Sequence, residues 1–302
     1  MQTIEQLKQQ FGIADRLDFS IGPADSVMID IDTPRAKARI AMQGAQVLAY
    51  QPAKAAQDLL YLSPLSRYGD RRAIRGGVPI CWPWFGDDPS GTGRPAHGFA
   101  RNRVWKLVTV RQKENDGIVL TMCLAKEEQD DTLWRCNYQL TMTIEISDQL
   151  TVSLTTENLD SECFVVSQAL HTYFAVSDIQ QTIVKELDGR RYLDKVENFC
   201  EKRQQGDVVF SGETDRIYLD SPDKLFIEDQ GWSRRIAITT TGSRSTVVWN
   251  PWEKVSALTD MHPDAYRYFV CVETANAASD SITLAPGQSH TLCASYRIMP
   301  LE

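Results

Sequence analysis

Alternation of apolar and polar residues along most of the chain constrains the fold more than any other feature. From Asp25 onward, segments rich in Val, Ile, Thr and aromatic residues are separated by short stretches of Asn, Asp, Gly, Ser or Pro. In residues 25–33, for example, Val27, Ile29 and Ile31 would share one face of a strand. The pattern predicts an all-β protein of about fifteen short strands, packed as a large antiparallel β-sandwich rather than as alternating βα units.

Helical periodicity is confined to the N-terminus. Residues 3–11 are predicted to form a short helix, because apolar residues recur there at three- and four-residue spacings. Two later junctions, at residues 114–117 and 147–149, are typical of hairpin turns. No repeat, low-complexity tract or Pro/Ser-rich linker divides the chain. We therefore predict a single domain over residues 1–302, with residues 1–20 as an N-terminal helical extension.

Charge and cysteine content argue against several classes of protein. The formal net charge is −8, whereas a generic binder of nucleic acid or anionic membrane is normally basic. The chain has no signal-peptide pattern at its start and no apolar run long enough to span a bilayer. The 7 cysteines are odd in number and contain no CxxC pair, which argues against a disulfide framework. We expect a cytoplasmic protein without nucleic-acid or membrane partners; its oligomeric state stays open, and a monomer is compatible with the sequence.

One segment, residues 67–103, breaks the strand pattern. It contains seven arginines, no lysine and three aspartates, so it is positively charged within an acidic chain. Two runs stand out in it, RGGVPICWPWFG at 75–86 and HGFAR at 97–101. Arginines on a rigid Gly/Pro loop beside aromatic rings suit a small anionic ligand, because guanidinium groups bind phosphate oxygens and aromatic faces pack against the C–H surface of a sugar.

A plainer interpretation of this segment is that its arginines are solvated loop charges and its tryptophans belong to the core. That interpretation is stronger for Arg67, Arg71 and Arg72 than for Arg75 and Arg101, which lie inside the two runs.

Two charged or titratable residues interrupt apolar strand patterns nearer the C-terminus. His171 lies within residues 164–174, where a strand histidine alone is most often a hydrogen-bonded structural residue. Glu273 lies within residues 268–274, on the predicted face of Phe269. A buried carboxylate is costly unless it is paired or protonated. Glu273 is therefore part of a structural hydrogen-bond network, a tuned general base, or a solvent-exposed residue of an edge strand.

The remaining motifs predict no metal and no cofactor. The 4 histidines lack metal-helix spacing, and no cluster of Cys, Asp or Glu completes a ligand set. A nucleophile elbow, a phosphate-binding loop and a dinucleotide fingerprint are absent from the sequence. Asp215, which precedes Arg216 at a loop-to-strand junction, says little by itself.

Taken together, the motifs resemble those of the aldose 1-epimerase (galactose mutarotase-like) superfamily. They are most similar to its glucose-6-phosphate 1-epimerase, or hexose-6-phosphate mutarotase, branch. Five motifs run in one order from about residue 25 to the C-terminus: RGGVPICWPWFG, HGFAR followed by Trp105, LHTYF, GETDRIY and VCVET. The resemblance implies a large antiparallel β-sandwich, the supersandwich of that superfamily. It also implies an isomerase that interconverts the α and β anomers of hexose 6-phosphates, chiefly glucose 6-phosphate.

The resemblance also assigns roles to residues at the matching positions. His171 in LHTYF matches the general acid, and Glu273 in VCVET matches the general base. Residues that hold sugar hydroxyls or the ring oxygen are matched by His97 and Asp215. The basic residues that the phosphorylated-sugar branch uses on its substrate are matched by Arg75 and Arg101. A small sugar phosphate is the implied partner.

Two other functions stay open on this sequence. One is a non-catalytic sugar-phosphate-binding or regulatory protein, because a fold alone never proves activity. The presence of both His171 and Glu273 favours the enzyme, since a pure binder needs no proton-transfer pair. The other is an epimerase of unphosphorylated aldoses, against which Arg75 and Arg101 argue.

Overall fold

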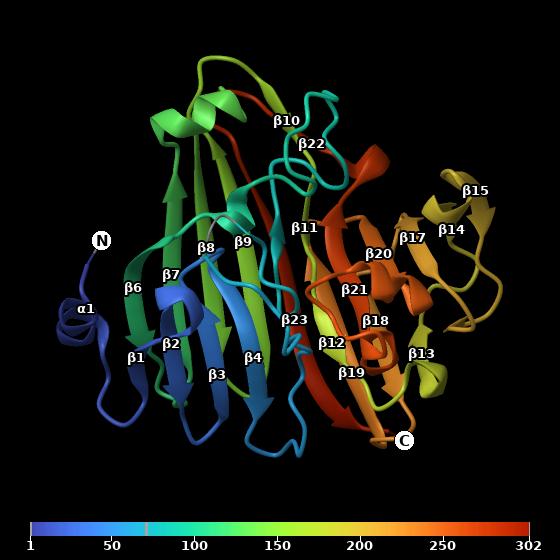
Figure 1. Cartoon of the computed structure of the whole chain (residues 1–302), viewed down its shortest axis with the longest axis horizontal. Coiled ribbons are helices and arrows are strands. Elements are labelled where there is room, and N and C mark those ends of the chain that lie inside the picture. The colour runs from blue at the N-terminus through green and yellow to red at the C-terminus, as the bar shows by residue number, and fades with distance from the viewer. Residues whose placement is uncertain (1, 70–71, 302) are drawn as a thin grey trace.

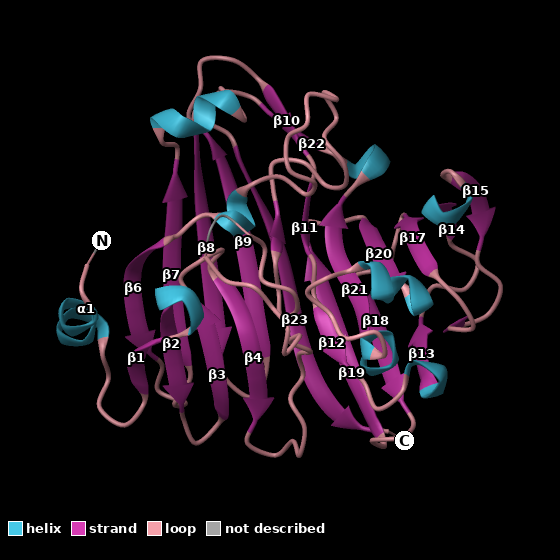
Figure 2. Cartoon of the chain, viewed as in Figure 1, coloured by secondary structure: helices cyan, strands magenta, loops and turns pink. Residues whose placement is uncertain are grey.

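Two layers of antiparallel strands form the body of the protein (Figures 1 and 2). The structure, a computed structural model, describes residues 2–69 and 72–301. Within these residues, one layer is a nine-stranded sheet with the following order: β16 (Val208–Val209), β13 (Thr182–Lys185), β18 (Lys224–Asp229), β19 (Arg234–Thr241), β23 (Ser289–Pro300), β9 (Leu150–Asn158), β8 (Tyr138–Ile146), β7 (Ile118–Ala125) and β6 (Lys106–Gln112).

The second layer contains two sheets that lie side by side in Figure 1. The larger one has the order β15 (Cys200–Arg203), β14 (Arg191–Asp194), β17 (Thr214–Leu219), β20 (Ser245–Asn250), β21 (Phe269–Asn276), β11 (Gln168–Leu170) and β5 (Ile80–Cys81), with β12 (Tyr173–Ala175) also paired to β21. The smaller one has the order β1 (Leu17–Ile21), β2 (Val27–Asp32), β3 (Ala36–Ala41) and β4 (Gln46–Pro52).

Shorter elements complete the described chain. A separate pair of strands is formed by β10 (Phe164–Val166) and β22 (Ile282–Leu284). The α-helix is α1 (Ile4–Phe11), and the 3-10 helices are η1 (Pro23–Asp25), η2 (Ala100–Asn102), η3 (Glu128–Thr132), η4 (Ile179–Gln181), η5 (Lys195–Glu197), η6 (Trp252–Ala257), η7 (Ala265–Tyr268) and η8 (Ala278–Asp280). No helix in the described part of the chain is long and apolar enough to cross a membrane.

The main core lies between the two layers and follows from strand alternation. In β8 and β9, every second residue is buried, and those residues face the opposite layer. The predicted all-β antiparallel fold is confirmed. The predicted hairpins are confirmed as well, because residues 113–117 link β6 to β7 and residues 147–149 link β8 to β9.

The N-terminal helix forms where its periodicity places it. Thr3 caps α1 by accepting a hydrogen bond from the backbone N–H of Gln6, and Leu7 and Phe11 are buried in the core. The helical part is shorter than the predicted extension over residues 1–20, because β1 begins at Leu17 and pairs with β2.

The segment over residues 67–103 contains little regular structure apart from β5 and η2. Its aromatic residues Trp82, Trp84 and Phe99 are buried in the main core, where Trp82 Nε1 donates to Thr156 Oγ1 at 3.0 Å. The plainer interpretation therefore holds for these rings. These three rings pack in the core and hold the loop against it, rather than line a ligand pocket.

Candidate active site

Glu273 lies in the interior of a sheet. Its strand, β21, is paired with β20 on one side and with β11 and β12 on the other. The side chain is 1% exposed and shares a face with Phe269 and Cys271. The edge-strand interpretation of this glutamate is therefore wrong, and its carboxyl group needs a partner or a proton.

His171 lies at a break between two strands that pair with β21. The pairing of Leu170 with Thr274 belongs to β11, that of Tyr173 with Cys271 belongs to β12, and His171 falls between them. Its backbone N–H donates instead to the carbonyl of Pro79, at 2.9 Å. The break releases His171 from the ladder and leaves its imidazole facing β21.

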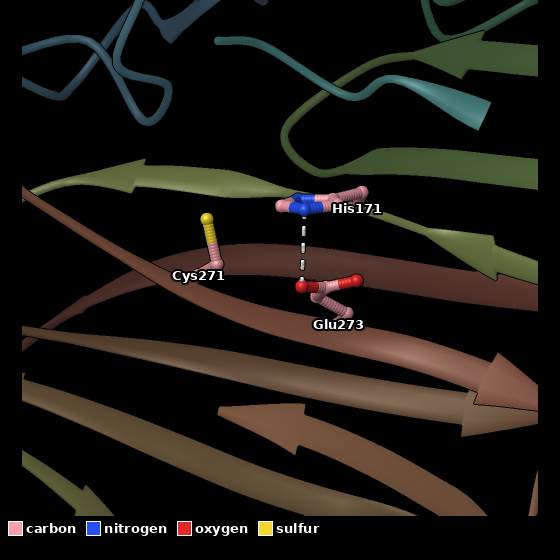
Figure 3. A group of neighbouring side chains, drawn as sticks. All are labelled: His171, Cys271 and Glu273. Atoms are coloured by element: carbon pink, nitrogen blue, oxygen red, sulfur yellow. Dashed lines mark ion pairs between the residues drawn. The ribbon is translucent and has the colours of Figure 1, made fainter. Parts of the chain in front are cut away.

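The two predicted catalytic groups meet at this break. His171 Nε2 lies 3.3 Å from Glu273 Oε1, and Figure 3 shows the imidazole directly across from the carboxyl group. Among the described residues, neither His171 Nδ1 nor Glu273 Oε2 has a hydrogen-bond partner, although both atoms are buried. Unsatisfied buried polar atoms are rare in folded proteins, and a catalytic role is one of the explanations for them.

Three rings surround the imidazole of His171. The ring of Tyr173 is stacked on it, the ring of Trp249 meets it edge-on with centroids 5.8 Å apart, and His97 meets it edge-on at 5.5 Å. Together they fix the plane of the imidazole.

His97 is held by the backbone of its own loop. Its N–H donates to the carbonyl of Gly86 at 2.6 Å, and its Nδ1 accepts from the N–H of Gly86 at 3.3 Å. Because Nδ1 is an acceptor, the proton of the neutral ring is assigned to Nε2. Burial lowers the pKa of His97 to about 3, with further lowering by Arg101, Lys195 and Arg75. His97 is therefore a neutral hydrogen-bond donor.

Burial pushes the acid–base pair towards its neutral forms. It lowers the pKa of His171 well below its ordinary value, helped by His97, Arg101 and Arg75. It raises the pKa of Glu273 well above its ordinary value, helped by the charge of Asp215 and opposed by Lys195 and Arg101. Both shifts favour a neutral imidazole and a protonated carboxyl group, so one proton shared by the pair rests on Glu273.

Arg75 and Arg101 both lie close enough to act on His171, but they are bound differently. Arg75 Nε donates to Asp260 Oδ2 at 3.2 Å, and its Nη1 donates to the hydroxyl of Tyr173 at 3.4 Å. Arg101 Nη2 donates to the carbonyl of Ala96 at 2.9 Å, while its buried Nε has no partner among the described residues. The Arg101 guanidinium therefore makes fewer hydrogen bonds within the described part of the protein than that of Arg75.

The other arginines of residues 67–103 do not add to a single anion site. Arg94 pairs with Asp88 at 2.6 Å and stacks on Trp84, and Arg103 pairs with Asp130 and Glu127. The expectation that the whole segment supplies a basic patch is therefore too broad.

The remaining three arginines of the segment are those that the sequence predicts to be solvated. Arg67 and Arg72 are exposed, as that interpretation requires, and Arg71 lies outside the described residues.

Asp215 reaches the site through a row of residues across the sheet. Register places Asp215 opposite Trp249, Trp249 opposite Cys271, and Cys271 opposite Tyr173. Directly opposed residues of antiparallel strands share a face. The carboxylate therefore lies on the face that carries Glu273, which explains its effect on the pKa of Glu273.

Strand alternation places Tyr173 on the face of His171, as the structure confirms, but sequence reasoning missed Lys195, Trp249 and Asp260 as neighbours of the site. Lys195 Nζ donates to Asp215 Oδ2 at 2.8 Å, from the start of η5. A lysine just after a strand is ordinary, so no local signal marks it. Trp249 and Asp260 reach the site through the order of the strands and loops in the assembled fold, which the local sequence around either residue does not indicate.

One group of side chains near the pair has donor atoms of the kind that bind metals. One ligand atom each of His171, Cys271 and Glu273 lies within 4.8 Å of the others (Figure 3). Burial raises the pKa of the Cys271 thiol, which keeps it protonated, and the charges of Arg75 and Arg101 oppose a cation there. These observations disfavour a metal at this place and leave the pair free for proton transfer.

Comparisons with known proteins show which family the chain resembles. The family model of aldose 1-epimerase matches residues 28–297. A protein of Escherichia coli K12 named "Putative glucose-6-phosphate 1-epimerase" is 38% identical over 253 residues and 83% of each chain. A protein of the same name from Salmonella typhimurium LT2 is 34% identical over 278 residues, covering 90% of this chain and 92% of its own. The crystal structure of "a putative mutarotase" from Salmonella typhimurium superposes with a TM-score of 0.89 at 32% identity, covering 96% of both chains.

Proposed function

The chain belongs to the aldose 1-epimerase family, and on this basis we propose that it interconverts the α and β anomers of hexose 6-phosphates, chiefly glucose 6-phosphate. The catalytic pair is His171 as general acid and Glu273 as general base. The observation that carries the proposal is their buried contact of 3.3 Å between Nε2 and Oε1, beside two polar atoms that have no hydrogen-bond partner in the described part of the chain.

In both ring opening and ring closing, the His171–Glu273 pair holds one proton in total, before and after the step. To open the ring, the Glu273 carboxylate takes the proton of the sugar O1 while the His171 imidazolium protonates the ring oxygen O5. The C1–O5 bond breaks and leaves an aldehyde, protonated Glu273 and neutral His171. After rotation about C1–C2, O5 attacks the other face of C1, His171 regains its proton from O5, and Glu273 returns its proton to O1.

The resting protonation of the site corresponds to the middle of this cycle. Burial favours protonated Glu273 and neutral His171, which is the distribution that accompanies the open-chain sugar. The closed-ring distribution contains the same number of protons and differs by one transfer along the 3.3 Å contact. A single environment therefore serves both half-reactions, and each transfer group is expected to contribute about 10²–10⁴-fold to the rate.

Two further residues are proposed to hold the pyranose. His97 would donate from Nε2, and Asp215 would accept hydrogen bonds from hydroxyl groups. Holding the ring in one orientation keeps both proton paths short, which lowers the entropic cost of the reaction. Ring opening changes no oxidation state, so we expect the reaction to proceed without a cofactor or metal.

Arg101, assisted by Arg75, is proposed to bind the 6-phosphate. The buried Nε of Arg101, which has no partner within residues 2–69 and 72–301, supports this role, because charge-assisted hydrogen bonds to phosphate would satisfy it. The phosphate is remote from C1, so the arginines would act on substrate selection and positioning rather than on proton transfer.

A second candidate is an epimerase of unphosphorylated aldoses. It is favoured by the engagement of Arg75 with Asp260 and of Lys195 with Asp215, which leaves fewer free cations than the sequence suggests.

Anomer exchange measured by NMR magnetisation transfer on glucose 6-phosphate and on glucose tests the proposal. We expect a kcat/KM for glucose 6-phosphate at least about tenfold above that for glucose, as one charge-assisted contact would give. Equal values for the two sugars would reject the phosphate assignment, and no exchange above the uncatalysed rate on either sugar would reject the enzyme.

A further inference from the structure

Lys195 forms an ion pair with the proposed sugar ligand Asp215. Its Nζ lies 2.8 Å from Asp215 Oδ2. We propose that Lys195 is a positioning residue, which holds Asp215 as an oriented carboxylate ready to accept hydrogen bonds from the sugar. This inference deepens the proposed function and rests on it in one respect, that Asp215 contacts the sugar.

The backbone around Lys195 is fixed, so the ion pair is built into the fold. Asp194, the last residue of β14, pairs with Arg216 of β17, which brings Lys195 alongside Asp215. The Asp194 side chain then accepts from the N–H of Val196 at 3.2 Å and from Lys202 Nζ at 2.9 Å. These contacts cap the start of η5 and fix the position of the backbone from which the Lys195 side chain extends.

The pair is more enclosed than an ordinary surface ion pair. The side chains of Lys195 and Asp215 are 26% and 19% exposed. The ammonium group also lies 6.0 Å from the ring centroid of Phe85, and that ring meets His97 edge-on at 5.0 Å. Lys195 therefore belongs to the wall of the site, one ring away from the histidine that is proposed to hold the sugar.

Charge explains what Lys195 does for Asp215. Burial raises the pKa of Asp215, and the charges of Glu213 and Asp194 raise it further, whereas Lys195 lowers it. Without the lysine, Asp215 would gain a proton more readily. A protonated carboxyl has one donor and fewer acceptor sites, so its hydrogen bonds to sugar hydroxyls would change.

Lys195 could instead be a direct ligand of the substrate phosphate, since its ammonium group has further N–H donors. The 2.8 Å contact to Asp215 favours the positioning role, and the two roles predict different behaviour towards sugars. A phosphate ligand matters only for the phosphorylated sugar. A residue that acts through Asp215 matters for any aldose that Asp215 holds.

The test compares Lys195→Met, Lys195→Arg, Asp215→Asn and the double variant Lys195→Met/Asp215→Asn on glucose 6-phosphate and glucose. Lys185→Met is the matched control, because it removes a lysine–aspartate pair of 2.7 Å, with Asp207, at 34% and 37% exposure, away from the site. Anomer exchange gives kcat and KM, and circular dichroism confirms folding.

The expected result is that Lys195→Met lowers kcat/KM by about 10–100-fold on both sugars alike, since it misplaces a group that orients the ring. Lys195→Arg should recover most of this loss, and Lys185→Met should behave as wild type. The double variant should be no worse than Asp215→Asn alone, because the lysine acts only through the aspartate.

Three results would overturn the inference: a loss confined to glucose 6-phosphate, losses that multiply in the double variant, or no loss at all. A readout independent of turnover is the ¹³C titration of the Asp215 carboxyl, assigned by its absence in Asp215→Asn. Lys195→Met should raise that pKa, and an unchanged midpoint contradicts the inference. If the wild type exchanges neither sugar, the proposed function fails while this titration still decides the role of Lys195.

Discussion

The ring of Tyr173 lies flat against the imidazole of His171, with centroids 4.9 Å apart and planes inclined by 11°. The hydroxyl of Tyr173 is in turn held by Arg75, which is anchored by Asp260. A chain of contacts from a distant loop therefore sets the plane of the proposed acid. This chain gives Arg75 a structural task besides any contact with substrate.

Two substitutions of Tyr173 distinguish the contribution of its ring to activity from that of its hydroxyl. Tyr173→Phe keeps the stacked ring and should lower kcat by less than about tenfold, whereas Tyr173→Leu should lower it by about 100-fold because the imidazole can rotate. Exchange kinetics with each variant, with urea unfolding as the control for folding, provide the measurement. Equal loss in both variants would show that the hydroxyl, not the stacked ring, matters.

Gly98 supports His97 through a close backbone approach. Its φ is +70°, and a Cβ at this position would lie 1.9 Å from the carbonyl oxygen of Trp82. We expect Gly98→Ala to destabilise the fold by about 2 kcal/mol or more and to lower kcat, because the loop that carries His97 must shift.

Gly86 offers a matched control for that substitution. Its φ is +84°, but no heavy atom lies within 4 Å of a Cβ built there. Gly86→Ala should therefore cost only the backbone strain. If urea unfolding shows equal destabilisation by the two alanines, the close approach at Gly98 is not the cause.

The pKa shifts of the pair predict the pH dependence of exchange. Because burial lowers the pKa of His171, the histidine should not titrate near pH 6.5, and activity should stay level as the pH passes through that value. Activity should fall on the alkaline side, where Glu273 with its raised pKa loses the shared proton.

Glucose is the better substrate for this pH profile, because a phosphate monoester titrates near pH 6 by itself. An inflection of kcat/KM close to pH 6.5 with glucose would contradict the neutral resting state of the pair.

Removing the charge of Glu273 should stabilise the protein in a pH-dependent way. A carboxyl whose pKa is raised in the folded state binds its proton more tightly there, so it lowers stability as the pH rises above its unfolded value of about 4.3. Glu273→Gln should therefore raise Tm relative to wild type by more at pH 8 than at pH 5. Glu114→Gln, in an exposed turn, is the control, and a Tm difference independent of pH would count against a raised pKa.

Arg101 should act on binding of the phosphorylated sugar. Arg101→Ala should raise KM for glucose 6-phosphate by about tenfold or more, with little change for glucose, because a charge-assisted contact to phosphate is lost. Arg67→Ala, an exposed arginine of the same segment, should change neither constant. A similar loss with both sugars would assign Arg101 to the pair or the pyranose rather than to the phosphate.

Much of the fold could be predicted because each strand carries its own signal. The alternation in β8 and β9 is strict, and the burial of Leu7 and Phe11 follows from helical spacing. The face of Glu273 was also predictable, since Phe269 and Cys271 occur at every second position before it. The break at His171 was not, because it depends on pairing with Pro79 from a distant segment.

The electrostatics of the site could be predicted only in part, for the same reason. Seven arginines in one segment suggest a basic patch, but the acceptors that occupy Arg75 and Arg103 include Asp260 and Asp130, which lie far away in sequence. Lys195 reaches Asp215 only through the register of β14 and β17. Such pairings are properties of the assembled sheets, so the composition of one segment cannot give them.

The most direct measurement is NMR magnetisation transfer between the anomers of glucose 6-phosphate, with wild type, Glu273→Gln and His171→Asn at equal concentration. Wild type should accelerate exchange, and both variants should fall to the uncatalysed rate while ligand-observed NMR still detects binding. Exchange by Glu273→Gln at the wild-type rate would contradict the assignment of this buried pair as the proton-transfer groups.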